Sequence, residues 1–318
     1  MKKVKVSFLW CGSFQDSVLF SILKSLINVE LVNIEKADLL IFGPQSEFSF
    51  NRKILNLVKR KTSIEKLFPN IDLFLLKRKF KPIKLFVSYE SNVHSSIKYD
   101  FSITPSLGIA NKNHFRYAHW KDTIDWKSQG YPRSEKNGFP SRFGGFCEID
   151  DLIKPLGKEF INKKREACII TSHLNEPRDS LFLNLEKHIK VNGYGPAFDK
   201  KLKDHHNKKF FKKDILKNYA FNLCPENSLY PGYYTEKIPE AFSCNCLPLT
   251  WADQNIDIDF NKRSFVNLLD YIQDDLNHIG ELLKDDNFLK KFSEEPLCLK
   301  APNLENEIKF ISKVVSNL

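Results

Sequence analysis

Short apolar strands alternate with segments of helical periodicity, and this alternation restricts the fold more than any other feature of the chain. Residues 3–10 are expected to form a strand, and residues 14–27 space their apolar side chains as a helix does. Apolar strands follow at 29–34 and 37–45, and a further strand at 83–90 ends on a carboxylate. Strands separated by helices form parallel sheets with crossover helices. The sequence therefore predicts an α/β protein.

The same alternation resumes in the second half of the chain. A strand is expected within 165–173 and a helix over 178–189, and further strands or strand ends follow at VNGYG, FNLCPEN, CLPLTW and SFVNL. Residues 268–318 have the spacing of amphipathic helices. Between the two halves, residues 121–146 are polar and rich in glycine and proline, which indicates loops.

The length of the chain indicates two domains, because 318 residues are too many for one ordinary core. We place the boundary in the lysine-rich stretch 155–163, which gives domains 1–158 and 159–318. Two α/β domains of similar size match the general plan of GT-B glycosyltransferases, in which two Rossmann-like domains face each other across a cleft. Other two-domain α/β proteins share this plan, so architecture alone does not decide the function. The chain has no Gly-x-Gly-x-x-Gly and no P-loop, which argues against a nicotinamide oxidoreductase or an NTPase.

The formal net charge of +10 is concentrated in two basic runs, residues 52–81 and 200–217. Such runs are usually solvated faces; the functional alternatives are contact with an anionic membrane surface, an anionic glycolipid or a nucleic acid. The seven cysteines lack Cys-x-x-Cys spacing and are expected to be free and mostly buried. The first residues are typical of a strand rather than a signal peptide, and no stretch approaches the ~20 apolar residues that span a bilayer. We therefore expect a cytoplasmic protein, or one at the inner face of a membrane.

The most informative stretch is Tyr219–Trp251, YAFNLCPENSLYPGYYTEKIPEAFSCNCLPLTW. A strand leads into a polar turn, and a loop then leads to Thr235, Glu236 and Lys237 at the start of a short helix, for which Thr235 is the expected N-cap. A helix N-terminus and Lys237 together favour an anion such as a diphosphate. A carboxylate beside them is suited to accept hydrogen bonds from ribose hydroxyls. Taken alone, this is a weak signal, because capped helices with charged first turns are common.

This stretch resembles the donor-binding signature of the alpha-1,3-fucosyltransferase family (glycosyltransferase family ten), which reads roughly YKFNLAFENS, then GYVTEK, then AYFAGTIPVYWG. Four other segments resemble the family in the expected order: FVSYESN (86–92), SHLNEPRDSLF (172–182), VNGYGPAF (191–198) and SFVNL (264–268). The chain is thus similar to bacterial-type members of that family over about 83–270.

The resemblance implies transfer of fucose from GDP-fucose to a sugar hydroxyl with inversion at the anomeric carbon. Direct displacement requires one general base and stabilisation of the leaving GDP. Glu90 matches the general base proposed for the family; an ordinary surface carboxylate at a strand end is the alternative. The resemblance also implies that the N-terminal domain binds the acceptor and the C-terminal domain binds the GDP-sugar.

The same resemblance assigns the residues that bind the donor. Arg178 and Lys237 match the cations that bind the diphosphate, through a guanidinium fork and an ammonium point charge. Glu236 matches the carboxylate that binds the ribose, and Asn227 and Tyr233 match positions that contact the donor. With these cations no metal and no cofactor is expected to be essential.

Asp257 and Asp259 form an Asp-x-Asp pair, a pattern that metal-dependent transferases of another fold use. It carries little information in a chain this rich in charge.

Some residues depart from the family pattern. Pro225 replaces the aromatic residue before Glu-Asn, Ala252 replaces the glycine after the tryptophan, and Tyr89 replaces the glycine before the strand-end carboxylate. Pro225 and Ala252 are expected to alter the floor of the donor pocket, so another GDP-sugar is an alternative donor.

Two further expectations concern partners. The leading hypothesis is an enzyme that decorates a glycan or glycolipid acceptor such as lipopolysaccharide, O-antigen or capsule, with the basic, partly apolar segment 52–80 contacting an anionic membrane. The alternative from another class is a non-catalytic protein that binds nucleotide sugars or polyanions. Basic runs without aromatic platforms argue against a nucleic-acid partner.

Overall fold

We describe the protein from a computed structural model. The structure describes residues 1–44, 82–91, 93, 95, 97–199 and 211–318. The membrane contact predicted for 52–80 lies outside the described residues. The described residues form two compact units. Unit 1 comprises Met1–Tyr117 and Leu304–Leu318, and unit 2 comprises Ala118–Asn303.

The division between the units differs from the predicted boundary at 158/159. The lysine-rich stretch does not separate the units, because its Phe160 is fully buried in unit 2. Trp120 and Trp126 are likewise buried in that unit. The segment between the predicted and observed boundaries therefore belongs to the core of unit 2. The apolar residues of Leu304–Leu318 belong to the core of unit 1.

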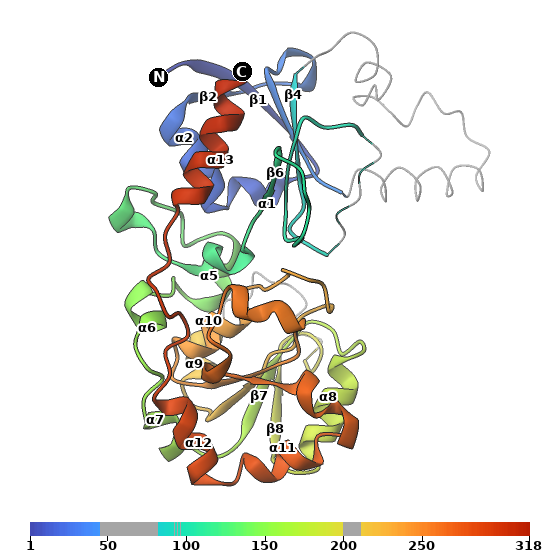
Figure 1. Cartoon of the computed structure of the whole chain (residues 1–318), viewed down its shortest axis with the longest axis vertical. Coiled ribbons are helices and arrows are strands. Elements are labelled where there is room, and N and C mark those ends of the chain that lie inside the picture. Colours follow the sequence, from blue (N-terminus) through green and yellow to red (C-terminus); the bar gives the residue numbers. More distant parts are fainter. Residues whose placement is uncertain (45–81, 92, 94, 96, 200–210) are drawn as a thin grey trace, which may run out of the picture. The chain divides into compact units, whose positions relative to one another are not determined.

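Unit 1 is built on a parallel sheet (Figure 1). Among its described residues the strand order is β2-β1-β3-β4-β5-β6. The strands are β1 Lys3–Leu9, β2 Asn28–Leu31, β3 Leu39–Phe42, β4 Ile83–Val87, β5 Phe101–Thr104 and β6 His114–Arg116. Every residue of β3 and β5 is buried, as expected for parallel strands that are covered on both faces. The register pairs Val6 with Leu39 and Leu39 with Ile83.

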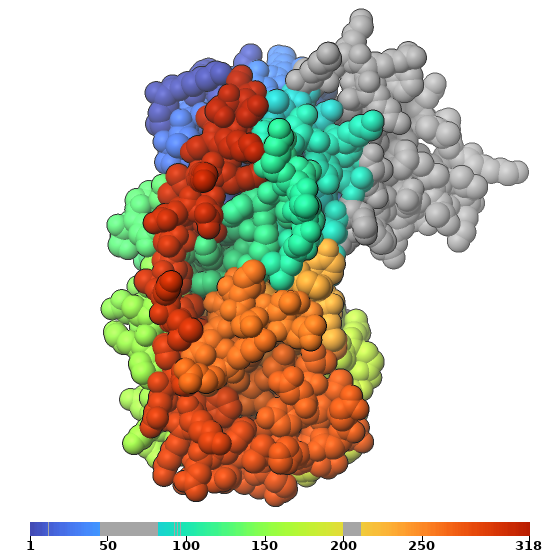
Figure 2. Space-filling view, viewed as in Figure 1, coloured from blue at the N-terminus to red at the C-terminus, as the bar shows by residue number. Residues whose placement is uncertain are grey.

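Helices α1 (Gly12–Gln15), α2 (Val18–Leu26) and α13 (Glu305–Ser316) belong to unit 1, with the 3₁₀ turn η1 (Ile34–Lys36). The helix predicted over 14–27 is interrupted because Ser17 is extended and its hydroxyl caps α2 by accepting the N–H of Phe20. Phe310 of α13 packs against Phe101 and Phe115 of the sheet. Figure 2 shows α13, in red, on the outside of unit 1.

Unit 2 is built on a second parallel sheet. In the described part of the unit the strand order is β11-β10-β9-β7-β8. The strands are β7 Ala167–Ile170, β8 Val191–Tyr194, β9 Phe221–Leu223, β10 Leu247–Thr250 and β11 Val266–Asn267. Ala167 is in register with both Val191 and Phe221, so β7 lies between β8 and β9. The predicted α/β class, with two parallel sheets, is confirmed.

Short helices surround the second sheet. They are α5 Gly138–Phe143, α6 Ile149–Ile153, α7 Glu159–Asn162, α8 Arg178–Glu186, α9 Lys212–Leu216, α10 Lys237–Phe242, α11 Asn277–Leu282 and α12 Asp286–Ser293. The 3₁₀ turns are η3 His119–Thr123, η4 Lys127–Gln129, η6 Gln254–Ile258, η7 Lys262–Ser264 and η8 Leu268–Asp274. Residues 121–146, predicted as loops, contain most of η3, all of η4 and α5. Their glycines act as helix ends: Gly130 and Gly144 are left-handed C-caps.

All seven cysteines lie in described segments and are free, six of them buried and Cys244 half-buried, as predicted. Within the described residues no helix is long and apolar enough to cross a bilayer.

The backbone segments at the carboxyl ends of β7 and β8 approach each other closely at Gly195. Its φ is +93°, and a Cβ there would lie 2.7 Å from the carbonyl oxygen of Thr171. Gly157 has a similar φ of +80° but open space around it. We expect Gly157→Ala to lose ~1 kcal/mol of unfolding free energy from backbone strain, and Gly195→Ala to lose a further ~1–3 kcal/mol from the clash. Urea unfolding of the whole chain measures both; equal losses would contradict the close approach.

Candidate functional site

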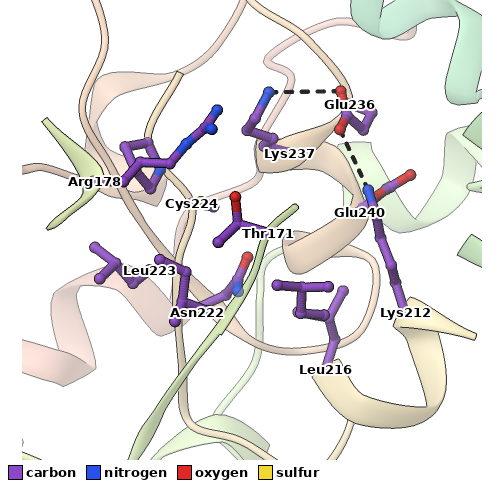
Figure 3. A pocket seen from close by; sticks show the side chains of 13 residues that line it. Thr171, Arg178, Lys212, Leu216, Asn222, Leu223, Cys224, Glu236, Lys237 and Glu240 are labelled. Carbon is purple, nitrogen blue, oxygen red and sulfur yellow. Dashed lines mark hydrogen bonds and ion pairs between the residues drawn. The ribbon is translucent and has the colours of Figure 1, made fainter. Parts of the chain in front are cut away.

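A pocket opens at the carboxyl ends of β7 and β9, beside the start of α10 (Figure 3). Parallel α/β sheets bind ligands at this edge. The volume of the pocket is about 50 Å³, which is small beside the roughly 300–1,000 Å³ of a typical ligand site. We call it the charged pocket; its lining residues are Ile169, Ile170, Thr171, Arg178, Lys212, Leu216, Asn222, Leu223, Cys224, Pro225, Glu236, Lys237 and Glu240.

A fully buried carboxylate, Glu226, follows β9 and contacts Lys237 of the pocket. It accepts a hydrogen bond from the N–H of Thr235 at 2.8 Å and from Nζ of Lys237 at 3.0 Å. The hydroxyl of Thr235 donates to Glu226 at 2.9 Å and accepts from Lys237 at 2.7 Å. Burial would lower the pKa of Lys237, but Glu226 and Glu236 outweigh burial and raise it. Lys237 is therefore held in its charged form.

These contacts correct the predicted N-cap. Helix α10 begins at Lys237, and its N-cap residue is Glu236, without a side-chain capping bond. Thr235 does not cap the helix because Glu226 takes both its N–H and its hydroxyl.

Glu236 lies between two ammonium groups. Its Oε1 is 3.3 Å from Nζ of Lys212, and its Oε2 is 3.8 Å from Nζ of Lys237. Burial opposes ionisation of Glu236, but Lys237 and Lys212 outweigh it and hold the pKa of this carboxyl well below its usual range. Glu236 is thus an anion that presents acceptor oxygens at the pocket wall.

Glu240, one helical turn after Glu236, is a second carboxylate of the pocket wall. Its Oε2 is 2.7 Å from Nζ of Lys212, while its Oε1 has no hydrogen-bond partner among the described residues. Burial, and then the nearby charge of Glu236, raise the pKa of Glu240 to about 7, although Lys212 opposes this shift. Of these two carboxylates of the pocket wall, Glu240 is therefore the more basic and Glu236 the more acidic.

Arg178, the first residue of α8, supplies a further cation. Its guanidinium donates to the amide oxygen of Asn227 and to the carbonyl oxygen of His173 at 3.5 Å. The amide group of Asn227 donates to the hydroxyl of Tyr233 at 3.2 Å. Tyr233 is buried, so it supports Arg178 through Asn227 rather than lining the pocket. Figure 3 shows the charged ends of Arg178 and Lys237 directed to the same side of the pocket.

The structure thus brings together five of the six residues singled out from the sequence. Arg178, Glu236 and Lys237 line the charged pocket, and Asn227 and Tyr233 adjoin it. The sixth, Glu90, belongs to unit 1, where it follows β4 and is exposed; its N–H donates to the hydroxyl of Ser88 at 3.4 Å.

Sequence reasoning missed Lys212, Glu226 and Glu240 as parts of the site. Lys212 belongs to the basic run that usually indicates a solvated face, and this interpretation is wrong for it, since only 19% of its side chain is exposed. Glu240 follows Glu236 at the i, i+4 spacing that places two residues on one helix face, which was an available signal.

The Asp-x-Asp pair does not form part of the pocket. Asp257 forms an ion pair with Lys262 at 3.3 Å, on the surface of unit 2. Within the described residues, no group of three His, Cys, Asp or Glu side chains has the arrangement of a metal site.

Known proteins are similar to this region in sequence and to the chain in fold. Residues 160–294 match the model described as Glycosyltransferase family 10 (fucosyltransferase) C-term. Alpha-(1,3)-fucosyltransferase FucT of Helicobacter pylori is 30% identical over 164 residues, which cover 50% of this chain and 32% of that protein. The 4-galactosyl-N-acetylglucosaminide 3-alpha-L-fucosyltransferase 9 of Bos taurus is 27% identical over 134 residues, or 40% and 34% of the two chains. The chain thus spans about a third of the length of these curated relatives.

A crystal structure of an alpha1,3-fucosyltransferase with GDP-fucose matches this structure with a TM-score of 0.65 at 21% identity, over 100% of this chain and 90% of that chain. A structure with GDP also gives 0.65, at 20% identity over 99% and 91%. The fold is therefore of the GT-B type found in these enzymes. The signature stretch and the whole charged pocket lie within the residues that match the family model. Residues 160–294 of this chain are therefore similar to the C-terminal region of glycosyltransferase family 10.

Proposed function

We propose that this protein transfers fucose from GDP-fucose to a hydroxyl group of a glycan acceptor, with inversion at the anomeric carbon. The observation that supports this most is that Arg178 lines one pocket at the carboxyl edge of a parallel sheet together with Glu236 and Lys237, which lie in a distant part of the sequence. Cations suited to a diphosphate and a carboxylate suited to ribose hydroxyls thus occur in one place.

In the proposed complex the diphosphate of the donor binds Arg178 and Lys237. The guanidinium offers a planar pair of donors, and the ammonium offers a point charge. Glu226 and Glu236 hold Lys237 in its charged form, while Asn227 orients Arg178. The positive groups are therefore in position before the ligand arrives, which is the condition for effective electrostatic stabilisation.

The proposed reaction is a single displacement. The acceptor oxygen attacks the anomeric carbon of fucose as its proton passes to the carboxylate of Glu90. The bond between that carbon and the phosphate oxygen breaks, and its electron pair leaves with GDP. Arg178 and Lys237 offset the negative charge that grows on the diphosphate. No covalent enzyme intermediate is needed, because one displacement inverts the centre.

We propose a glycan or glycolipid of the bacterial surface, such as lipopolysaccharide, O-antigen or capsule, as the acceptor, with synthesis in the cytoplasm at the inner face of the membrane. The basic composition of 52–80 favours contact with an anionic membrane.

A second candidate donor is another GDP-sugar. Pro225, which stands where the family signature has an aromatic residue, lines the charged pocket. A change of shape in the pocket wall alters which ligand fits, whereas the cations for the diphosphate remain.

A thermal-shift panel of GDP-fucose, GDP-mannose, UDP-sugars and GDP separates these candidates. We expect GDP-fucose at ~100-fold excess over its Kd to stabilise the fold by ~2.7 kcal/mol. Greater stabilisation by GDP-mannose than by GDP-fucose at the same concentration would favour the other donor, and no response to any guanine nucleotide would refute the proposal.

Arg178→Ala tests the diphosphate site with little risk to folding, because the side chain is only partly buried. Hydrogen bonds to charged groups contribute ~1.5–3 kcal/mol, so we expect GDP affinity measured by calorimetry to fall roughly 10- to 100-fold. Lys217→Ala, which removes an exposed cation of unit 2 paired with Asp214, is the matched control and should bind GDP normally. Wild-type affinity in Arg178→Ala would contradict the assignment.

Glu90→Gln tests the general base. We expect hydrolysis of GDP-fucose, followed as GDP release, to slow by roughly 10²- to 10⁴-fold, while affinity for GDP stays unchanged. Glu35→Gln, another exposed carboxylate of unit 1, should retain the wild-type rate. A Glu90→Gln variant that releases GDP as fast as the wild type would exclude Glu90 as the base.

A further inference from the structure

Lys212, from a neighbouring helix, contacts the carboxylates of Glu236, the N-cap residue of α10, and of Glu240 within α10. Its Nζ lies 3.3 Å from Oε1 of Glu236 and 2.7 Å from Oε2 of Glu240. Lys212 is the first residue of α9 and lines the charged pocket together with both glutamates. Figure 3 shows its ammonium group beside the two carboxylates. The lysine lies outside the stretch Tyr219–Trp251 that carries the family signature.

An ammonium group in this position depends on its partners. A mostly buried lysine loses hydration and is tolerated in a folded protein only when it is paired. Burial would lower the pKa of Lys212, but Glu240 and Glu236 outweigh burial and raise it. Glu240 makes the shorter contact and is itself almost fully buried. Glu240 therefore fixes the ammonium group, which in turn contacts Glu236.

Glu236 is consequently held from two sides. Lys212 contacts its Oε1, and Lys237 lies beside its Oε2. The two cations come from different helices, α9 and α10, so rotation of the carboxylate would weaken at least one contact. A binding group that is already oriented loses less conformational entropy when the ligand arrives.

We infer that Lys212, held by Glu240, is a positioning residue that orients the carboxylate of Glu236 toward the two hydroxyls of the donor's ribose. This inference rests on the proposed function, because it assumes that the pocket binds a nucleotide sugar. An ionised carboxylate has two acceptor oxygens and so can accept from both hydroxyls of the ribose. Without Lys212, Glu236 keeps its charge through Lys237 but loses its fixed orientation.

The test compares two nucleotides that differ only in those hydroxyls, GDP and 2′,3′-dideoxy-GDP, by calorimetry. We expect wild-type protein to prefer GDP by roughly tenfold or more, because hydrogen bonds from the hydroxyls to a carboxylate are charge-assisted. In Lys212→Met the preference should fall below about threefold, with affinity for the dideoxy nucleotide within about twofold of wild type. Lys217→Ala, the control from the residue following the same helix, should keep the full preference.

Conservative variants separate positioning from a structural role. Lys212→Arg should restore most of the preference, since a guanidinium can also contact both carboxylates. Glu240→Gln keeps the ammonium group but weakens its anchor, so it should reduce the preference partially; it carries the test if Lys212→Met does not fold.

The outcomes distinguish the two proposals. Full preference for GDP in Lys212→Met or, where that variant does not fold, in Glu240→Gln would overturn the positioning role. Equal weakening of both nucleotides would also overturn it, because that result indicates only a structural contribution. Wild-type protein that binds GDP without preferring it over the dideoxy form would overturn the positioning role alone. Wild-type protein that binds neither nucleotide would overturn the proposed function, and the positioning role with it.

Discussion

The contact between the buried carboxylate of Glu226 and the ammonium group of Lys237 is the interaction on which the site depends. A carboxylate with no exposed surface is stable in a protein only when cations and hydrogen-bond donors surround it. Thr235 supplies two donors and Lys237 the charge. The same contacts fix the point at which α10 begins, and therefore where Glu236 and Glu240 face the pocket.

The charged side chains of the pocket form a network in which each group is paired with one of opposite charge. Glu226 holds Lys237, Lys237 and Lys212 hold Glu236, and Glu240 holds Lys212. Such networks keep polar groups oriented in a medium of low dielectric constant, where an unpaired charge is costly. The site is thus organised before a ligand binds, and the cost of burying its charges is offset within the fold.

The sequence predicts the strands well because apolar runs between helices leave few alternatives: β1, β3, β4, β7 and β10 all fall within the expected segments. The domain boundary was not predictable in this way. The composition of the lysine-rich stretch does not indicate that its Phe160 is buried, and α13 packs on the first sheet through a contact between residues far apart in the sequence. In the site, Glu236 and Lys237 were found through the order of residues in the signature stretch, and Arg178 through the segment 172–182 that also resembles the family. Lys212 was not found, because composition does not reveal that one lysine of a basic run faces inward.

The return of α13 to unit 1 has a consequence for how the protein is made. Phe101 and Phe115 are translated early, whereas Phe310, which packs on both, is translated only after all of unit 2. During translation, an apolar face of the first sheet therefore remains uncovered while unit 2 is synthesised and can fold. Exposed apolar surface of this kind promotes aggregation and chaperone binding. Synthesis of unit 1 thus begins before that of unit 2 and is completed after it.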